Sequence, residues 1–212
     1  MILLGIDFEE WYHPELVKPY IKNEMKKPSI VKGIDKILDW LRITETYATF
    51  FVVGEILETN PEILDKIIEN GHEIGFHTMN HTRLDSAGFR EKFSGELERF
   101  ANLTNNRSKG FRAPTFSLNY ESKWAIDLLT EHGYTYDSSI MPTKTSMYGF
   151  SEAETRPYRI SDTLIRDEPT GKILEFPMLI GKFLGKNVPT AGGFYIRFLP
   201  MTTIKKSIKE YA

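Results

Sequence analysis

Two histidines four residues apart, His77 and His81, are the side chains of this sequence best suited to binding a metal ion. In a helical turn this spacing places both imidazoles on one side, where they can bind the same divalent cation. The intervening residues lack the glutamate of the zincin pattern His-Glu-x-x-His, so two histidines of an ordinary exposed turn fit the pair equally well. Because the chain has no cysteine, any metal site must use histidine and carboxylate ligands.

Acidic residues at the end of the first apolar segment can complete such a site. Asp7 and Glu9 are two residues apart, so in an extended chain their side chains lie on one face and that of Glu10 points away. We therefore favour Glu9 over Glu10 as the third ligand. One carboxylate and two imidazoles leave coordination positions for water and substrate, as in catalytic metal sites. Asp7 can then accept a proton from water, although an acid here is also a common turn or helix cap.

The elements that must position these residues follow from the hydrophobic pattern. Apolar runs rich in β-forming residues predict strands at 2–7, 48–53, 73–76, 110–112, 134–136 and 173–177. Apolar residues at helical spacing predict helices that begin near Ser29, Asn60, Phe89 and Trp124, and a last helix through 204–211. Residues 141–172 contain three prolines and no clear period, which predicts a long insertion with little regular structure.

Alternating strands and helices predict an α/β fold, in which repeated units form a doubly wound sheet or a barrel. In both architectures the ligand site lies at the carboxyl ends of the strands. Polar residues follow four of the predicted strands: Asp7, Glu9 and Glu10; His77, Thr78 and His81; Arg112; and Asp137, Ser138 and Ser139. We expect these residues to meet on one face.

These residues fall within ordered motifs that resemble those of the polysaccharide deacetylases of carbohydrate esterase family four, the NodB-homology domain. The acidic motif is Gly5-Ile-Asp-Phe-Glu-Glu-Trp11, which is similar to the variant of the exopolysaccharide-locus subgroup. The histidine motif is His77-Thr-Met-Asn-His81, the third is Arg112-Ala-Pro-Thr-Phe116, and Tyr136-Asp-Ser-Ser-Ile140 resembles the segment around the fourth. The resemblance implies a distorted (β/α) barrel with fewer than eight strands, forming one catalytic domain over residues 1–212.

The resemblance also implies an activity, the removal of acetyl groups from N-acetylhexosamine units of a polysaccharide or glycan precursor by a metal-activated water. Zn²⁺ is the expected metal, and the implied ligands are Glu9, His77 and His81. Asp7 corresponds to the catalytic base and Arg112 to the residue that orients it; a planar guanidinium can hold a carboxylate ionised, although a surface ion pair would use the same residue type. Asp137 corresponds to a catalytic position near the general acid, and capping of a turn is its alternative role.

Several residues near these motifs are candidates for binding the sugar. Trp11 offers a flat apolar face to a pyranose ring, and Pro114 and Phe116 would form a groove wall, although aromatic side chains after a strand often pack in the core. Gly193 and Phe194 lie in Gly192-Gly-Phe-Tyr-Ile-Arg197, which also looks like the subgroup. The glycine pair allows close backbone approach to a ligand, or forms an ordinary turn.

One feature departs from the family, which usually carries a histidine near its carboxyl terminus to protonate the leaving amine. No histidine follows His132. The chain is then truncated at its C-terminal end, takes its acid from elsewhere, or is inactive. Two other functions therefore stay open: a related amidohydrolase acting on a small cyclic amide, and a non-catalytic carbohydrate-binding protein.

Composition excludes several other classes of partner. A formal charge of −2 and a sequence pI near 6.2 provide no net attraction to nucleic acid, so the expected partner is an N-acetylated glycan. No apolar stretch approaches the ~20 residues of a membrane-spanning helix. The apolar run at the amino terminus is too short for a secretory signal, which predicts a cytoplasmic protein.

Overall fold

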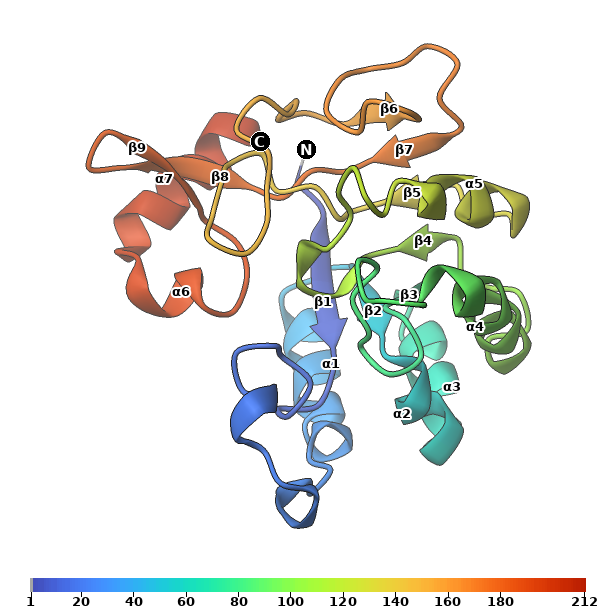
Figure 1. Cartoon of the computed structure of the whole chain (residues 1–212). Helices are drawn as coiled ribbons and strands as arrows, with labels where there is room; N and C mark the ends of the chain where they lie inside the picture. The colour runs from blue at the N-terminus through green and yellow to red at the C-terminus, as the bar shows by residue number, and fades with distance from the viewer. Residues whose placement is uncertain (1) are drawn as a thin grey trace.

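The computed structural model of the chain, which describes residues 2–212, is built around one sheet of seven strands (Figure 1). The strands are β1 (Leu4–Phe8), β2 (Ala48–Val52), β3 (Glu73–Phe76), β4 (Gly110–Phe111), β5 (Tyr136–Asp137), β6 (Tyr158–Ile160) and β7 (Ile173–Glu175). They are ordered β1-β2-β3-β4-β5-β7-β6, and all pairs are parallel except β6 with β7. In the described part of the chain β1 and β6 are the edges of this sheet, so the predicted fold with fewer than eight strands is present without closure into a complete ring.

Helices connect the parallel strands and lie outside them (Figure 1). They are α1 (Ile34–Ile43), α2 (Gly54–Thr59), α3 (Glu62–Glu69), α4 (Arg90–Leu103) and α5 (Trp124–Glu131), with the short 3-10 turns η1 (Lys18–Tyr20), η2 (Asn23–Met25), η3 (Ile30–Lys32) and η4 (Pro114–Phe116). The predicted helices are present. The sequence pattern missed α2, because six residues are too few to show a period.

A second unit follows the sheet, formed by the hairpin β8 (Ile180–Phe183) and β9 (Lys186–Pro189) with the helices α6 (Tyr195–Phe198) and α7 (Met201–Tyr211). Helix α7 packs on β8 (Figure 1). The hairpin was not predicted, and β6 lies inside the segment 141–172 that was expected to have little regular structure. No helix among residues 2–212 is both long enough and apolar enough to cross a membrane.

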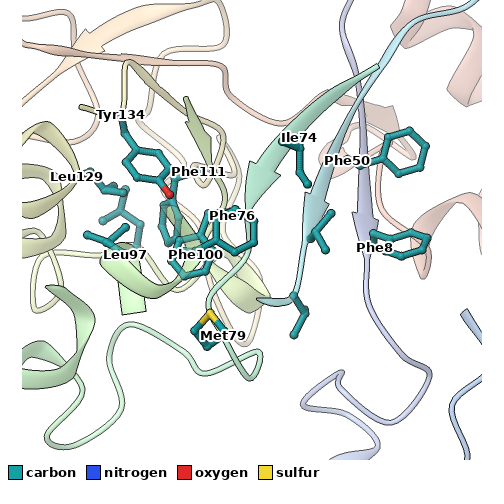
Figure 2. Close-up of a cluster of buried hydrophobic side chains, with 14 of the residues drawn as sticks. Phe8, Phe50, Ile74, Phe76, Met79, Leu97, Phe100, Phe111, Leu129 and Tyr134 are labelled. Carbon is teal, nitrogen blue, oxygen red and sulfur yellow. The ribbon is translucent and has the colours of Figure 1, made fainter. Parts of the chain in front are cut away.

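The hydrophobic core lies between the sheet and its outer helices (Figure 2). The rings of Phe76 and Phe100 stack with their centroids 4.4 Å apart, and Phe111 packs beside Phe76. Alternate residues of the same strands face the other side of the sheet, where Gly75 leaves room for the ring of Phe51; a Cβ atom at Gly75 would lie 2.6 Å from it. The sheet thus has an apolar outer face, and its inner face has room for larger side chains.

Candidate active site

Strand register places the predicted residues in one row on the inner face. Asp7 is the register partner of Phe51, and Phe51 that of Gly75, so the positions two residues further along these strands are Glu9 and His77. Arg112 follows β4, whose Phe111 is the partner of Phe76. Side chains alternate along a strand, which turns Arg112 and His77 toward the same side.

Arg112 is the link between β4 and β1. Its Nη1 donates to Asp7 Oδ1 at 2.7 Å, while Nε donates to the Ser138 carbonyl at 2.9 Å and Nη2 to Ser138 Oγ at 2.8 Å. The guanidinium lies 4.1 Å from the centre of the Phe51 ring, within cation–π distance, and 95% of Arg112 is buried. These four contacts leave the guanidinium one orientation, and Asp7 is oriented with it.

The pKa of Asp7 reflects two opposing effects. Desolvation by burial alone would raise the pKa of this carboxyl, and the positive charge and hydrogen bond of Arg112, together with the neighbouring His77 and His81, more than compensate. The net pKa is lowered from its ordinary value, so Asp7 is ionised at neutral pH. Its side chain keeps 33% of its surface exposed, which leaves the carboxylate accessible to water.

Glu9, His77 and His81 together form a group that can hold a metal ion. One ligand atom from each lies within 4.8 Å of the others. His77 Nδ1 donates to the Arg112 carbonyl at 2.6 Å, so Nε2 has its lone pair free for a metal, which is the usual arrangement of a ligating histidine. Burial lowers the pKa of His77 to about 4, so the ring is neutral and able to ligate at pH 7.

An unsatisfied oxygen in this group fits a cation. His81 Nε2 lies 2.9 Å from Glu9 Oε2, yet within residues 2–212 this buried carboxylate oxygen has no hydrogen-bond partner. A buried oxygen without a donor is costly. Two imidazoles and a carboxylate are a donor set that suits Zn²⁺.

The two histidines do not lie on a helix, which corrects the expectation from their spacing. Residues 77–81 form an irregular loop after β3, in which Thr78 and His81 have positive φ angles of 57° and 51°. A positive φ angle is unfavourable for a β-branched residue such as threonine, so contacts with neighbouring residues must hold Thr78 in this conformation. Thr78 Oγ1 accepts the Thr82 amide at 2.9 Å, and Glu96 Oε2 accepts the Met79 amide at the same distance.

Glu10 has a different set of contacts from Glu9. It is 2% exposed, and its carboxylate accepts the backbone N–H groups of Ser29 and Ile30 at distances from 2.8 to 3.3 Å. The carboxylate therefore caps η3. The structure brings Glu9, and not Glu10, to the two histidines.

Asp137 is not brought to this cluster. It is the register partner of Phe111, which faces the helices, so its side chain lies on the opposite side of the sheet from Arg112. The buried carboxylate accepts Ser139 Oγ at 2.6 Å and pairs with Glu175 from β7. Ser139 Oγ in turn accepts the Ala113 amide at 2.8 Å. These contacts join the ends of β4, β5 and β7, and a catalytic role for Asp137 stays a prediction.

The residues predicted to bind sugar occupy two places. Trp11 is 43% exposed beside the acidic motif, with its indole N–H bonded to the Lys27 carbonyl at 3.1 Å. Buried Pro114 opens η4, in which Phe116 contacts the Tyr148 ring, centroid to centroid 5.1 Å. Tyr148 interacts with Tyr195 through its hydroxyl group. The Tyr195 ring contacts that of Phe194, which follows the exposed Gly193.

Two residues contact the metal-binding group in a way that the sequence did not predict. His13 Nε2 lies 2.8 Å from Glu55 Oε1, and the His13 ring stacks on His81. Glu55 follows β2 in the same way that the other site residues follow their strands. Its place just after the predicted strand 48–53 is the sequence signal that indicates Glu55.

Comparison with family models supports the placement of these motifs. Residues 27–136 match the model described as polysaccharide deacetylase, a range that includes His77, His81 and Arg112 and begins after Asp7 and Glu9. Residues 138–212 match a second model, a domain of unknown function (DUF3473). The boundary falls within the sheet, since β5 of the first segment pairs with β7 of the second.

Individual proteins agree with the family model. The chain is 32% identical over 116 residues to the peptidoglycan deacetylase-like protein FGM2 of Gibberella zeae, covering 53% of this chain and 33% of that protein. It is 28% identical to a peptidoglycan deacetylase of Helicobacter pylori (55% and 40% covered) and 30% identical to a chitooligosaccharide deacetylase of Sinorhizobium fredii (45% and 43%). The matched region is thus less than half the length of each of these relatives.

Solved structures share the fold. A Mycobacterium smegmatis protein provisionally assigned to the polysaccharide deacetylases superposes with a TM-score of 0.60 at 21% identity, covering 98% of this chain and 68% of that one. The PuuE allantoinase gives 0.55 at 17% identity, covering 83% and 60%. With a family model that matches more than half of the sequence and the same fold in solved structures, the chain belongs to the polysaccharide deacetylase family.

Proposed function

We propose that this chain is a metal-dependent hydrolase that removes acetyl groups from N-acetylhexosamine units of a polysaccharide or glycan precursor. The observation that carries the proposal is the Glu9, His77 and His81 cluster directly beside the Asp7–Arg112 pair. The names of the relatives, which describe deacetylation of peptidoglycan and chitooligosaccharides, support the reaction type. Strand pairing across the two matched segments supports a single catalytic domain.

Each residue has a role in the proposed reaction. Glu9, His77 and His81 would hold the zinc ion, which would supply Lewis-acid chemistry toward an acyl oxygen and water. Arg112 occupies Asp7 Oδ1, so Oδ2 is the oxygen that takes the proton from the attacking water. The same guanidinium keeps Asp7 ionised and fixed in position before the reaction, and it does not itself change protonation.

The aromatic residues suit a sugar substrate. We propose that the exposed ring of Trp11, and those of Phe116 and Phe194, contact the sugar. Rings of this kind stack on the flat apolar faces of pyranoses. We propose that Pro114 and Gly193 shape the backbone of this surface, with Pro114 fixing the turn of η4.

Metal content and acetate release test the proposal together. We expect about one zinc per chain by elemental analysis, lost in Glu9→Ala and His77→Ala. His132→Ala is the matched control, because His132 pairs with Ser94 outside the cluster. The wild type should release acetate from N-acetylglucosamine oligomers. A chain that stays metal-free after incubation with zinc would overturn the proposal.

Asp7→Asn separates the enzyme from the two other functions. The proposed enzyme loses turnover in this variant and keeps its affinity for glycan, because the metal ligands and the aromatic surface are intact. Glycan binding without any turnover in the wild type would indicate a carbohydrate-binding protein. Hydrolysis of a small cyclic amide, with no acetate from oligomers, would indicate an amidohydrolase instead.

A further inference from the structure

The two histidine ligands are held in different ways. His77 has its second ring nitrogen fixed by the Arg112 carbonyl at 2.6 Å. His81 Nδ1 is buried and has no hydrogen-bond partner within residues 2–212. Ligating histidines almost always have the other nitrogen held by a neighbour, which orients the ring. The orientation of His81 must therefore come from packing.

His13 supplies that packing. Its ring lies against His81 at a centroid distance of 5.7 Å with an interplanar angle of 13°, a parallel stack, and it is 4% exposed. Stacked rings at this distance resist rotation of either partner about its χ angles. The His13 ring thus covers one face of the His81 ring. This contact can orient His81 only if His13 is itself held in one orientation.

Two hydrogen bonds make His13 rigid. The backbone N–H of Glu10 donates to Nδ1 at 3.1 Å, so Nδ1 is the unprotonated nitrogen. Nε2 then carries the proton and donates to Glu55 Oε1 at 2.8 Å. Both edges of the ring are held, one by the loop after β1 and the other by the first turn of α2.

Glu55 also holds the loop that carries the two histidine ligands. Its second oxygen, Oε2, accepts Asn80 Nδ2 at 2.8 Å, and its backbone N–H donates to the Met79 carbonyl at 2.9 Å. One carboxylate on a helix therefore bridges the loop after β1, which carries Glu9, and the loop after β3.

We infer that Glu55 and His13 form a positioning pair that orients His81 and fixes the spacing of the two ligand-bearing loops. The inference rests on the proposed function, since it assumes that Glu9, His77 and His81 hold a metal. Neither residue is a ligand in this arrangement. Both act through His81, so their loss should weaken metal binding while the fold of the metal-free chain persists.

Zinc affinity measured by competition with a chromophoric chelator tests the pair. We expect His13→Ala and Glu55→Ala to raise the dissociation constant by about 10- to 100-fold. Glu55→Gln should stay within about threefold of wild type, because its amide oxygen still accepts from His13 and a flipped Asn80 can accept from its NH₂ group. The absorption spectrum of the Co²⁺-loaded protein should change in His13→Ala, since it reports ligand geometry.

Glu58→Ala is the matched control. Glu58 lies on the same helix and pairs with Arg99, away from the ligand loops, so its loss should leave the zinc affinity unchanged. Thermal unfolding of the metal-free proteins shows whether the variants fold. Unchanged zinc affinity in folded His13→Ala and Glu55→Ala would overturn the inference alone. A wild type that binds no zinc would overturn this inference together with the proposed function.

Discussion

Arg112 Nη1 donates to Asp7 Oδ1 at 2.7 Å, joining two residues that are 105 positions apart in the sequence. The backbone carbonyl of the same arginine accepts His77 Nδ1 at 2.6 Å. Arg112 therefore fixes the proposed base with its side chain and a proposed metal ligand with its main chain. A substitution at this position can separate the two roles, because only the side chain changes.

Arg112→Lys should lower kcat while leaving the metal site intact. Lysine keeps the charge but cannot contact Asp7, the Ser138 carbonyl and Ser138 Oγ together. Misplacement of the base should cost about 10²-fold in turnover. Zinc content should stay at the wild-type level, since the carbonyl that holds His77 remains. Steady-state kinetics and elemental analysis of one preparation check both parts, and loss of the metal would contradict the separation.

Glu9 and Glu10 should give opposite results when each is replaced by alanine. Glu9→Ala removes a proposed ligand, so zinc affinity falls. Glu10→Ala instead removes the carboxylate that caps η3, at a cost of about 0.5–2 kcal/mol in the free energy of unfolding. Urea unfolding of the metal-free proteins and chelator competition measure the two effects. Metal loss in Glu10→Ala, with Glu9→Ala unaffected, would reverse our assignment.

Gly5→Ala should displace Arg112. A Cβ atom at Gly5 would lie 2.7 and 2.9 Å from the two terminal guanidinium nitrogens and 3.0 Å from the Phe51 ring. Because Arg112 is held from several sides, we expect a loss of about 1–3 kcal/mol in stability and a reduced kcat. Gly95→Ala on α4 is the control; its Cβ would meet nothing within 4 Å, so the helix should gain about 0.5–1 kcal/mol. A fully active Gly5→Ala enzyme would argue against a fixed guanidinium.

The free energy of unfolding should fall as pH rises, because Glu175 ionises in the folded state. Burial, and then the neighbouring charge of Asp137, raise the pKa of Glu175 well above its ordinary value of 4.5. A raised pKa in the folded state means that stability is complete below pH 4.5 and is lost as pH rises toward the folded value. In that window the loss is about 1.4 kcal/mol per pH unit.

Glu175→Gln should remove this contribution, because a neutral amide can keep the Ile140 N–H bond and donate to Asp137. In urea unfolding between pH 4 and 8, the free energy of unfolding of the variant should increase relative to that of the wild type as pH rises. Glu91→Gln on the exposed surface of α4 is the control and should follow the wild-type curve. Parallel curves for Glu175→Gln and wild type would show that the buried pair shares no proton.

The order of strands and helices was predictable because each element has a local pattern long enough to detect. Strand β3 and helix α4 lie within one residue of their predicted limits. The elements missed, which are α2, β6, α6 and the β8–β9 hairpin, are all short. Contacts with α3 and α4 hold α2, contacts with β7 hold β6, and α7 packs on β8, so these elements do not depend on a periodicity of their own.

The sequence by itself determined which chemical groups are available and at which strand ends they lie: acids after the first strand, histidines after the third and an arginine after the fourth. It also favoured Glu9 over Glu10 through the two-residue period of an extended chain, and Glu9 is the residue that lies beside the two histidines. The expected helical turn for His77 and His81 was wrong, because backbone donors on α2 and the carboxylate of Glu96 hold that loop in a conformation its own residues disfavour.

Only the tertiary structure decided which of these groups meet. Strand register turned Asp137 to the helix-facing side beside Glu175, and it turned Arg112 to the inner side beside Asp7. Position in the sequence does not fix register between strands, since each pairing depends on how complete side-chain layers pack on both faces. The stack of His13 on His81, and the carboxylate of Glu55 that supports it, come from two loops and helix α2 and exist only once the sheet has formed.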